Sequence, residues 1–175
     1  MNSQIVLAAL VAILLTGPAG PASAQPRADL SSGVARAVSS YDKYTVFDDV
    51  RANVEGTVVT LSGKVTMPGK REEIGKRVAA VEGVTTVKNE IDVLAPSPSD
   101  DDLRRRVARA IYGNAAFWRY ASMPTPPIRI LVERGRVTLT GNVATESDRL
   151  LARSLATGLG ETSLTCELTL DRAGR

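Results

Sequence analysis

The chain has 175 residues, of which 43% are hydrophobic and 23% charged, and its formal net charge is +3. This is the composition of an ordinary globular protein, and the length allows one domain or two very small ones. The chain has no His and a single Cys, Cys166. A metal site built from His and Cys, a His-based catalytic triad and an intrachain disulfide are therefore excluded. We predict no catalytic residues, no metal and no cofactor.

The N-terminal segment has the features of a secretory signal peptide. Residues 5–15 form an almost unbroken apolar run, which is shorter than the about 20 residues that span a bilayer. Gly and Pro follow it, and the small residues Ala22 and Ala24 flank Ser23 as at a cleavage site. We predict a signal peptide at 1–24, a mature chain from Gln25 and export to the periplasm. An uncleaved anchor or a soluble hydrophobic tail are the alternatives.

Two segments of the chain resemble each other. Residues 59–63, Val-Thr-Leu-Ser-Gly, return at 137–141 as Val-Thr-Leu-Thr-Gly, and the match extends in both directions. The further pairs include Leu30 with Leu103, Val34 with Val107, Val54 with Val132, Val65 with Val143, Arg71 with Arg149, Gly83 with Gly160 and Ile91 with Leu168. A duplication explains these matches, with small insertions and deletions in the connections.

Each copy predicts the same order of elements. Apolar residues at helical spacing come first, then two strands with alternating apolar residues and a Gly in the turn, then a second helix and a third strand. The predicted core positions of the first copy are Leu30, Val34, Ala37, Val38, Val50, Ala52, Val54, Val59, Leu61, Ile74, Val78, Val81, Val87, Ile91 and Val93. Those of the second copy are Leu103, Val107, Ala110, Ile111, Ile128, Ile130, Val132, Val137, Leu139, Leu151, Leu155, Leu164, Leu168 and Leu170.

The predicted fold class is therefore α+β, with two tandem αββαβ modules. Each module is a three-stranded mixed sheet with two helices on one face. We place the first domain at 28–94, a Pro/Ser linker at 95–101 and the second domain at 102–171. Each domain is close to the lower size limit for independent stability, so we expect the two to pack together.

The motifs of the first copy resemble the BON domain of bacterial envelope proteins. The family's hairpin pattern, Gly-x-Val-x-Leu-x-Gly-x-Val, is nearly complete in Gly56, residues 58–63 and Val65, and the last strand reads Gly83-Val84, Val87 and Asn89. In the second copy the hairpin is intact, but the last strand has drifted to Gly160-Glu161, Leu164 and Cys166. The resemblance implies an envelope protein linked to osmotic stress and outer-membrane integrity, and some members of the family bind anionic phospholipid.

The front of the second copy is rich in Arg and aromatic residues. Six Arg and no acidic residue lie between residues 103 and 132, and the part of the chain from Asp100 on carries the whole net charge of +3. At 100° per residue, Arg105, Arg109 and Tyr112 point away from the apolar face of the predicted helix, and Trp118 and Arg119 follow shortly. Arg donates paired hydrogen bonds to phosphate, and Trp and Tyr suit the headgroup layer. We predict that these five residues bind anionic phospholipid.

The same residues also have plainer interpretations. A charged run on a helix is usually a solvated face, and Phe117 and Trp118 would cap the core of a small domain. Nucleic acid suits Arg with aromatic residues as well. An exported protein rarely meets nucleic acid, however, so we expect none as a partner.

Several residues are predicted to have structural roles. Gly56 and Gly135 suit hairpin turns with positive φ, and Gly63 and Gly141 indicate a bulge or the close approach of a helix. Residues 67–73 predict a solvated turn into a helix with Glu72 and Glu73 in its first turn, and Thr145 or Ser147 a helix cap. The acidic residues Asp48 and Asp49 show no paired arrangement, and Asp100, Asp101 and Asp102 indicate a linker end and helix cap.

Strand alternation places Cys166 with Leu164, Leu168 and Leu170 on the core side. We therefore expect a buried thiol, with an intermolecular disulfide as the alternative. Its counterpart in the first copy, Asn89, is then expected to be partly buried and hydrogen-bonded.

The leading hypothesis is a non-enzymatic exported envelope protein. Its second domain contacts anionic phospholipid, its first serves as a scaffold or contacts an envelope protein partner, and the whole supports membrane integrity or osmotic-stress tolerance. The alternative is a periplasmic protein-interaction module or holdase chaperone without lipid binding. An enzyme is the third and least favoured hypothesis. The residues that usually carry acid, base or metal chemistry are missing from the sequence or are not clustered in it.

Overall fold

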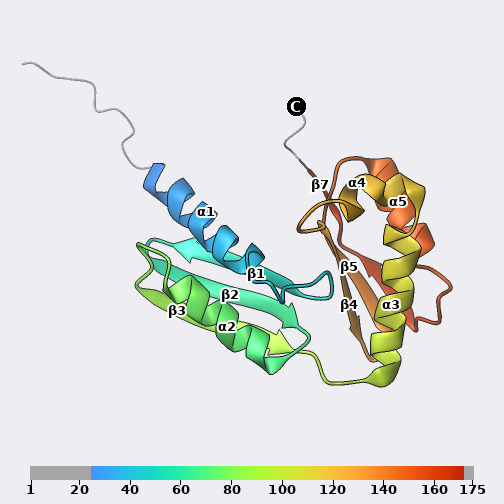
Figure 1. Cartoon of the computed structure of the whole chain (residues 1–175), viewed down its shortest axis with the longest axis horizontal. Coiled ribbons are helices and arrows are strands. Elements are labelled where there is room, and N and C mark those ends of the chain that lie inside the picture. The colour runs from blue at the N-terminus through green and yellow to red at the C-terminus, as the bar shows by residue number, and fades with distance from the viewer. Residues whose placement is uncertain (1–24, 172–175) are drawn as a thin grey trace, which may run out of the picture.

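The computed structural model describes residues 25–171, which form two αββαβ modules (Figure 1). The first module comprises α1 (Gln25–Ser39), β1 (Asp49–Glu55), β2 (Val58–Val65), α2 (Pro68–Ala79) and β3 (Thr86–Val93). The second comprises α3 (Pro98–Tyr112), the 3-10 helix η1 (Ala115–Phe117), α4 (Trp118–Ala121), β4 (Ile128–Glu133), β5 (Arg136–Val143), α5 (Glu146–Leu155), β6 (Ser163–Cys166) and β7 (Thr169–Leu170). The predicted signal peptide lies outside the described residues. None of the helices described could cross a membrane.

Both sheets are mixed, which confirms the predicted fold class. In the first sheet β2 is central, antiparallel to β1 and parallel to β3. In the second sheet β5 is central, antiparallel to β4 and parallel to β6. In each module the two long helices pack on one face of the sheet (Figure 1). The opposite face of each sheet is free of helices.

The last strand of the second module is broken in two. After β6, the amide of Glu167 donates to the carbonyl of Leu139 at 2.8 Å, and the chain resumes pairing with β5 only as β7. Leu168 remains buried in the core, but Leu170 is 46% exposed. The expectation that Leu170 faces the core is therefore wrong, because the break in pairing moves it beyond the covered part of the sheet.

Each module has its own hydrophobic core. In the first, α1 and α2 contribute Val34, Ile74 and Val78 to a cluster with Leu61 and Ile91 of the sheet. The cluster of the second module contains, among others, Leu103, Val107, Ile111, Ile128, Ile130, Leu139 and Leu168, as the sequence pattern predicts, together with Phe117 and Tyr120. The helical and strand periodicities therefore place the core correctly at most positions.

The second module begins earlier than the sequence indicates. Helix α3 starts at Pro98, inside the predicted linker, because the hydroxyl of Ser97 accepts the amide of Asp100 at 3.3 Å. The carboxylate of Asp100 is buried and accepts the amides of Arg134 and Gly135, each at 2.8 Å. The cap of α3 is therefore Ser97, and not one of the predicted residues Asp100, Asp101 and Asp102. Asp100 instead holds the turn of the β4–β5 hairpin against α3.

Two glycines are required by the close approach of neighbouring strands. Gly63 has φ +113° and Gly141 has φ +105°. A Cβ on Gly63 would lie 2.1 Å from the carbonyl oxygen of Asp49, and one on Gly141 would lie 1.9 Å from that of Pro127. The approaching group is thus the backbone at the start of the partner strand, and not a helix, which was one of the two predicted explanations beside a bulge. The turn glycines of both hairpins have the positive φ that we predict.

Asn89 of β3 and Cys166 of β6 occupy corresponding positions, beside Leu61 and Leu139 of the central strands. Asn89 is partly buried, donates to the carbonyl of Arg71 at 2.8 Å and accepts the amide of Ile91 at 3.3 Å. A Cβ on Gly75 of α2 would lie 2.6 Å from the Asn89 amide nitrogen, so this glycine makes room for it. Cys166 faces the second core as predicted, but it is half-buried and not the fully buried thiol that we expect.

A buried ion pair ties the loop before β1 to the start of α2. The carboxylate of Asp48 is fully buried and accepts Nζ of Lys70 at 2.6 Å. It also accepts the amide and hydroxyl of Thr45 at 2.8 and 2.7 Å, and those of Thr66 at 2.9 Å each. Lys70 is only 3% exposed and also donates to the Thr66 hydroxyl at 2.8 Å. A buried charge needs this degree of compensation.

This pair corrects two predictions. Residues 67–73 are not a wholly solvated segment, because Lys70 is buried, and Asp48 is paired. Helix α2 begins at Pro68, so Glu72 and Glu73 lie beyond its first turn, which contains no acidic residue. The predicted cap of α5 is confirmed, since Thr145 and Asp148 form a reciprocal capping box.

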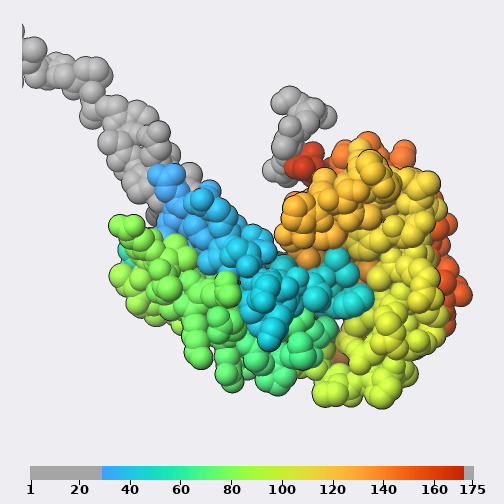
Figure 2. Space-filling view, viewed as in Figure 1, coloured from blue at the N-terminus to red at the C-terminus, as the bar shows by residue number. Residues whose placement is uncertain are grey.

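The loop held by Asp48 joins the two modules. The amide of Ile130 in β4 donates to the carbonyl of Val46 at 2.7 Å, and Arg129 donates to the carbonyl of Thr45 at 3.1 Å. The Arg129 guanidinium also lies over the ring of Tyr44 at 4.7 Å, and Phe47 packs against the second core. In Figure 2 this loop, in cyan, lies between the modules.

Along the outer edge of β4, a backbone group of every second residue has a hydrogen-bond partner from outside the sheet. Val46 covers it at Ile130, and side chains of α3 cover it on either side. Tyr112 donates to the carbonyl of Ile128 at 2.5 Å, and Arg104 donates to that of Val132 at 2.5 Å. Unpaired backbone groups at a strand edge invite pairing with other chains, so this covering closes β4 to them.

Replacing Asp48 by Ala should leave Lys70 buried without its partner and lower the free energy of unfolding by about 3–5 kcal/mol. Lys70→Met should cost less, about 1–3 kcal/mol, because the carboxylate keeps its bonds to Thr45 and Thr66. Urea unfolding followed by circular dichroism measures both. The control is Glu73→Ala, which removes an exposed ion pair with Arg77; an Asp48→Ala loss no larger than this control would contradict the role of the pair.

Acid should weaken the fold partly through Asp48. Burial raises the pKa of this carboxyl, but the hydrogen bonds from Lys70, Thr66 and Thr45 together hold it below its ordinary value of 3.8. The stabilisation is therefore complete above about pH 4 and is lost as the pH falls through the lowered folded-state pKa. Urea unfolding between pH 2 and 6 should show a shallower decline for Asp48→Asn than for the unchanged protein. Parallel declines would rule out this contribution.

Candidate functional site

The connection between α3 and β4 distinguishes the second module from the first. It runs over residues 113–127, whereas the matching connection between α1 and β1 runs over residues 40–48. We call residues 113–127 the aromatic insertion; it contains η1, α4 and three aromatic side chains. The duplication therefore preserves the sheet and the long helices, and the modules differ at this end.

Two of the three aromatic residues anchor the insertion. Phe117 is fully buried and Tyr120 is 4% exposed, with their ring centroids 5.8 Å apart. The Tyr120 hydroxyl accepts the amide of Ala144 at 2.8 Å and donates to the carboxylate of Asp148 at 2.8 Å. Arg119 also pairs with Asp148 and lies over the Tyr120 ring at 4.6 Å. These contacts fasten α4 to the start of α5.

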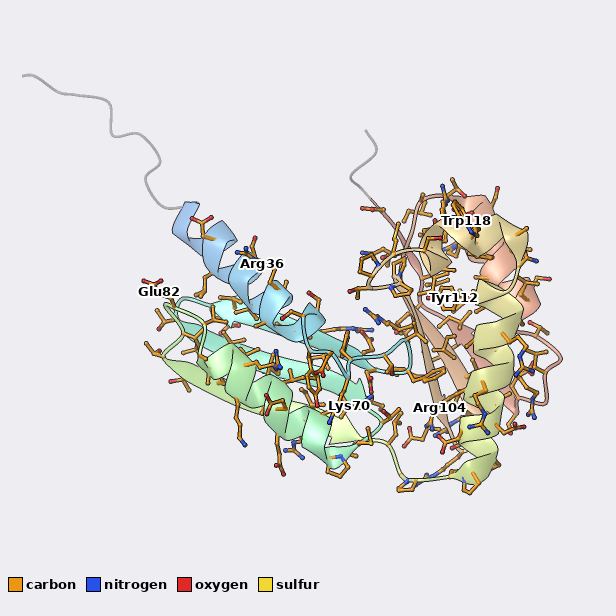
Figure 3. The ribbon with its side chains drawn as sticks, in the orientation of Figure 1. Arg36, Lys70, Glu82, Arg104, Tyr112 and Trp118 are labelled. Carbon is orange, nitrogen blue, oxygen red and sulfur yellow. The ribbon has the colours of Figure 1, made fainter. Side chains whose placement is uncertain are left out.

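The same geometry turns Trp118 outward. It stands between the buried Phe117 and Tyr120 on one short helical turn, so its side chain cannot share their direction. Trp118 is 72% exposed. In Figure 3 it lies with Tyr112 at the C-terminal end of α3, and Arg104 lies toward the other end of that helix. The interpretation that both Phe117 and Trp118 cap the core is therefore wrong for Trp118, and of these two residues only Phe117 enters the core.

The anchor occupies the position that the buried ion pair has in the first module. Asp148 aligns with Lys70, and Ala144 aligns with Thr66. Where the amide of Thr66 donates to the Asp48 carboxylate, the amide of Ala144 donates to the Tyr120 hydroxyl. Burial, followed by the adjacent carboxylate, raises the pKa of Tyr120. Burial also raises the pKa of Asp148, but hydrogen bonds from Tyr120 and Thr145 and the charge of Arg119 hold it below its ordinary value.

Most of the Arg residues in the basic region are already neutralised or structural. Arg105 pairs with Asp102 at 3.5 Å, and Arg106 pairs with the same carboxylate. Arg119 pairs with Asp148, and Arg104 and Arg129 bind backbone carbonyls at the edge of β4 and in the joining loop. Arg109, exposed in the last turn of α3, has no ion pair within residues 25–171.

The expected orientation of Tyr112 is wrong. It is half-buried, packs against the second core and donates its hydroxyl to Ile128. Burial raises the pKa of this hydroxyl well above its ordinary value. Three of the five predicted residues are thus exposed close to each other in sequence, Arg109 at the end of α3 and Trp118 and Arg119 on α4. Arg105 is exposed one turn earlier on α3. Tyr112 is not part of this exposed surface, because it packs against the core.

Three exposed residues in or near the aromatic insertion were not predicted from the sequence as part of the site. Met123 follows α4 and is 44% exposed, and Leu150 on α5 is 56% exposed. Arg153, also on α5, is exposed and has no ion pair within the described chain. Leu150 could have been recognised, because Leu151 takes the core-facing position and two consecutive residues on a helix face different directions. Met123 carries no such signal.

The position of Arg104 was also open to prediction. It stands three residues before Val107 and seven before Ile111, so the helical period places it on the buried face. It is 4% exposed, and its Nε has no hydrogen-bond partner. No group of His, Cys, Asp or Glu side chains suited to a metal ion occurs within residues 25–171.

Two two-layer αββαβ modules that share the same hairpin define the architecture of the chain, and the comparison of sequences identifies the family. The model of the BON domain matches residues 27–95 and 99–162. The chain belongs to the BON domain family and contains two copies of the domain. The second match ends just before β6, the first part of the broken last strand. No curated protein matches the chain.

Solved structures with some likeness include two of the protein CdsD. One is described as CdsD, a structural protein of the type III secretion system of Chlamydia trachomatis, with 14% identity, a TM-score of 0.31 and coverage of 83% of this chain and 95% of that one. The other is the C-terminal domain of CdsD, with 13% identity, a TM-score of 0.29 and coverage of 82% and 98%. TM-scores this low do not establish a common overall arrangement.

The exposure of Trp118 can be measured directly because it is the only Trp in the chain. Its fluorescence emission should lie close to that of Trp in water, and acrylamide should quench it almost fully. Tyr120→Phe removes the bonds to Ala144 and Asp148 and should cost about 1–3 kcal/mol of stability, with little change in the emission maximum. A blue-shifted, protected emission in the unchanged protein would contradict the outward orientation.

Proposed function

We propose that this protein is a non-enzymatic, exported envelope protein whose second BON domain contacts an anionic phospholipid surface. The observation that carries the proposal is the outward position of Trp118 on the aromatic insertion, close to the end of α3 that bears Arg109. An indole with an apolar body and a polar N–H suits the boundary between headgroups and acyl chains. We further propose that this contact supports membrane integrity or osmotic-stress tolerance.

The surface combines apolar and basic groups on connected elements. Trp118 and Met123 belong to the aromatic insertion, and Leu150 lies on α5, to which Tyr120 and Arg119 fasten that insertion through Asp148. Each basic residue near an anionic surface contributes about 1 kcal/mol. Because most Arg of the region are paired, the electrostatic contribution rests chiefly on Arg109 and Arg153, and apolar insertion carries the rest. We therefore propose weak, reversible binding.

The cellular location is part of the same proposal. The apolar run at residues 5–15 and the small residues at 22–24 support a cleaved signal peptide and a periplasmic protein that binds the membrane peripherally. The first domain, which lacks the aromatic insertion, would serve as a scaffold. The proposed action is binding, in keeping with a family of binding modules, and it includes no reaction and no cofactor.

A protein-interaction or holdase role is the alternative. The exposed side chains Trp118, Met123 and Leu150 would suit an apolar protein partner as well as a membrane. The two functions differ in their dependence on lipid charge, which the following experiment measures.

The purified protein should co-sediment with vesicles that contain phosphatidylglycerol and much less with vesicles of phosphatidylcholine alone. Trp118→Ala should weaken binding about tenfold, since it removes most of the inserted apolar area. Arg109→Glu should weaken it by several-fold and reduce the dependence on phosphatidylglycerol. The Trp118 emission should shift to shorter wavelength as vesicles are added.

Matched controls exist in the first module. Arg36 occupies on α1 the position that Arg109 has on α3, and Met67 is an exposed apolar residue outside the proposed surface. Arg36→Glu and Met67→Ala should leave vesicle binding unchanged. Binding that ignores phosphatidylglycerol, or that survives Trp118→Ala together with Arg109→Glu, would exclude the lipid role. Suppression of client aggregation without vesicle binding would favour the holdase alternative.

A further inference from the structure

The helix-free faces of the two sheets enclose a cleft between the modules. Its volume is about 410 Å³, within the range of small-ligand sites. Residues of β1 and β2 line one wall, and residues of β4, β5 and β6 line the other. The helices of each module cover the opposite faces of the sheets, so the cleft is separate from the aromatic insertion, which follows α3. In Figure 2 the surfaces of the two modules part beside the joining loop.

Two ion pairs cross the cleft and hold its walls. Lys64 of β2 binds Glu133 of β4 at 2.6 Å, and Arg51 of β1 reaches Glu167 at 3.5 Å. The Thr140 hydroxyl of β5 donates to Asp49 of β1 at 3.1 Å. The attraction of Lys64, followed by other cations nearby, lowers the pKa of Glu133. The three carboxylates of the lining therefore already have partners.

One cation and four hydroxyls of the lining make no hydrogen bond or ion pair within residues 25–171. Ser62 lies alone on β2. The other four side chains lie together on the second sheet, Arg136 and Thr138 on β5 and Ser163 and Thr165 on β6. Arg136 is registered against Ser163, and Thr138 against Thr165, so the four side chains form a continuous patch on one wall. This patch can donate to one acidic group and to several neutral oxygens.

The first module lacks this patch. Val58 stands at the position of Arg136, and Lys88 stands at that of Thr165. The arrangement is therefore a property of the second copy and does not follow from the fold alone. The lining of the cleft contains three acidic and three basic side chains, so it offers no excess of positive charge to a polyanion. It also contains no aromatic ring for stacking.

From this pattern we infer that the inter-module cleft binds a small hydroxylated carboxylate, such as a sugar acid. The carboxylate pairs with the guanidinium of Arg136, and the hydroxyls of the ligand exchange hydrogen bonds with Thr138, Ser163 and Thr165. A single negative charge matches the single unpartnered cation, and Asp49, Glu133 and Glu167 repel a second one. The site is independent of the proposed membrane contact.

Glucuronate is the probe, and isothermal titration calorimetry with ligand-observed NMR on the full chain measures its binding. We expect a dissociation constant of about millimolar, with Arg136→Gln weakening it at least about tenfold, since the lost hydrogen bonds involve charged groups. Thr138→Val with Thr165→Val should weaken it several-fold. Glucose, which lacks the carboxylate, and glucose 6-phosphate, which carries more charge, should both bind more weakly.

The matched controls lie outside the cleft. Arg153→Gln removes an exposed, unpaired Arg from α5, and Thr60→Val with Thr86→Val makes the same exchange on the first sheet; both should leave glucuronate binding unchanged. Equal binding of glucose, tighter binding of glucose 6-phosphate, an unchanged affinity in Arg136→Gln, or no detectable glucuronate binding would each overturn the inference. None of these outcomes bears on vesicle binding, so the two proposals are tested separately.

Discussion

The buried carboxylate of Asp48 is the constraint on which the arrangement of the two modules depends. Its two oxygens accept five hydrogen bonds, from Lys70, Thr45 and Thr66, and these bonds bring together the loop before β1, the end of β2 and the start of α2. The same loop then offers the carbonyls of Thr45 and Val46 to β4. A charge removed from water needs all of these partners, so the loop has one conformation, and that conformation is the one that meets the second module.

The two BON domains show how a duplicated frame can diverge without losing its fold. At the position where the first domain joins a carboxylate to an ammonium group, the second joins the hydroxyl of Tyr120 to the carboxylate of Asp148. Both solutions satisfy the backbone amide that follows the central strand, at Thr66 and at Ala144. The second solution draws its hydroxyl from the aromatic insertion, and this requirement is what leaves Trp118 on the outside. The structural need and the proposed contact surface thus arise from the same few residues.

The sequence was sufficient for the αββαβ elements and most of the core, because periodicity and turn glycines are local signals. It did not predict η1, α4 or the break between β6 and β7. The burial of Arg104 could also have been predicted, since the helical period places this residue on the buried face. Its charge, however, favours an exposed position. The contact between Asp48 and Lys70 could not be predicted, because a whole hairpin separates the two residues in the sequence. The residues around each of them are also typical of an exposed turn. The contact between the two modules could not be predicted from the sequence for another reason. Its central bond, from Ile130 to Val46, links two backbone groups, and backbone groups leave no signature in the choice of residues.

The covered edge of β4 also decides how the two domains can exist apart. A second domain cut off from the first would lose Val46 and Phe47, exposing the amide of Ile130 and part of its own core. The first domain would lose no comparable cover, because its strands are not completed by the second. The dependence therefore runs in one direction. A second domain produced alone would therefore carry an uncovered strand edge of the kind that invites edge-to-edge association.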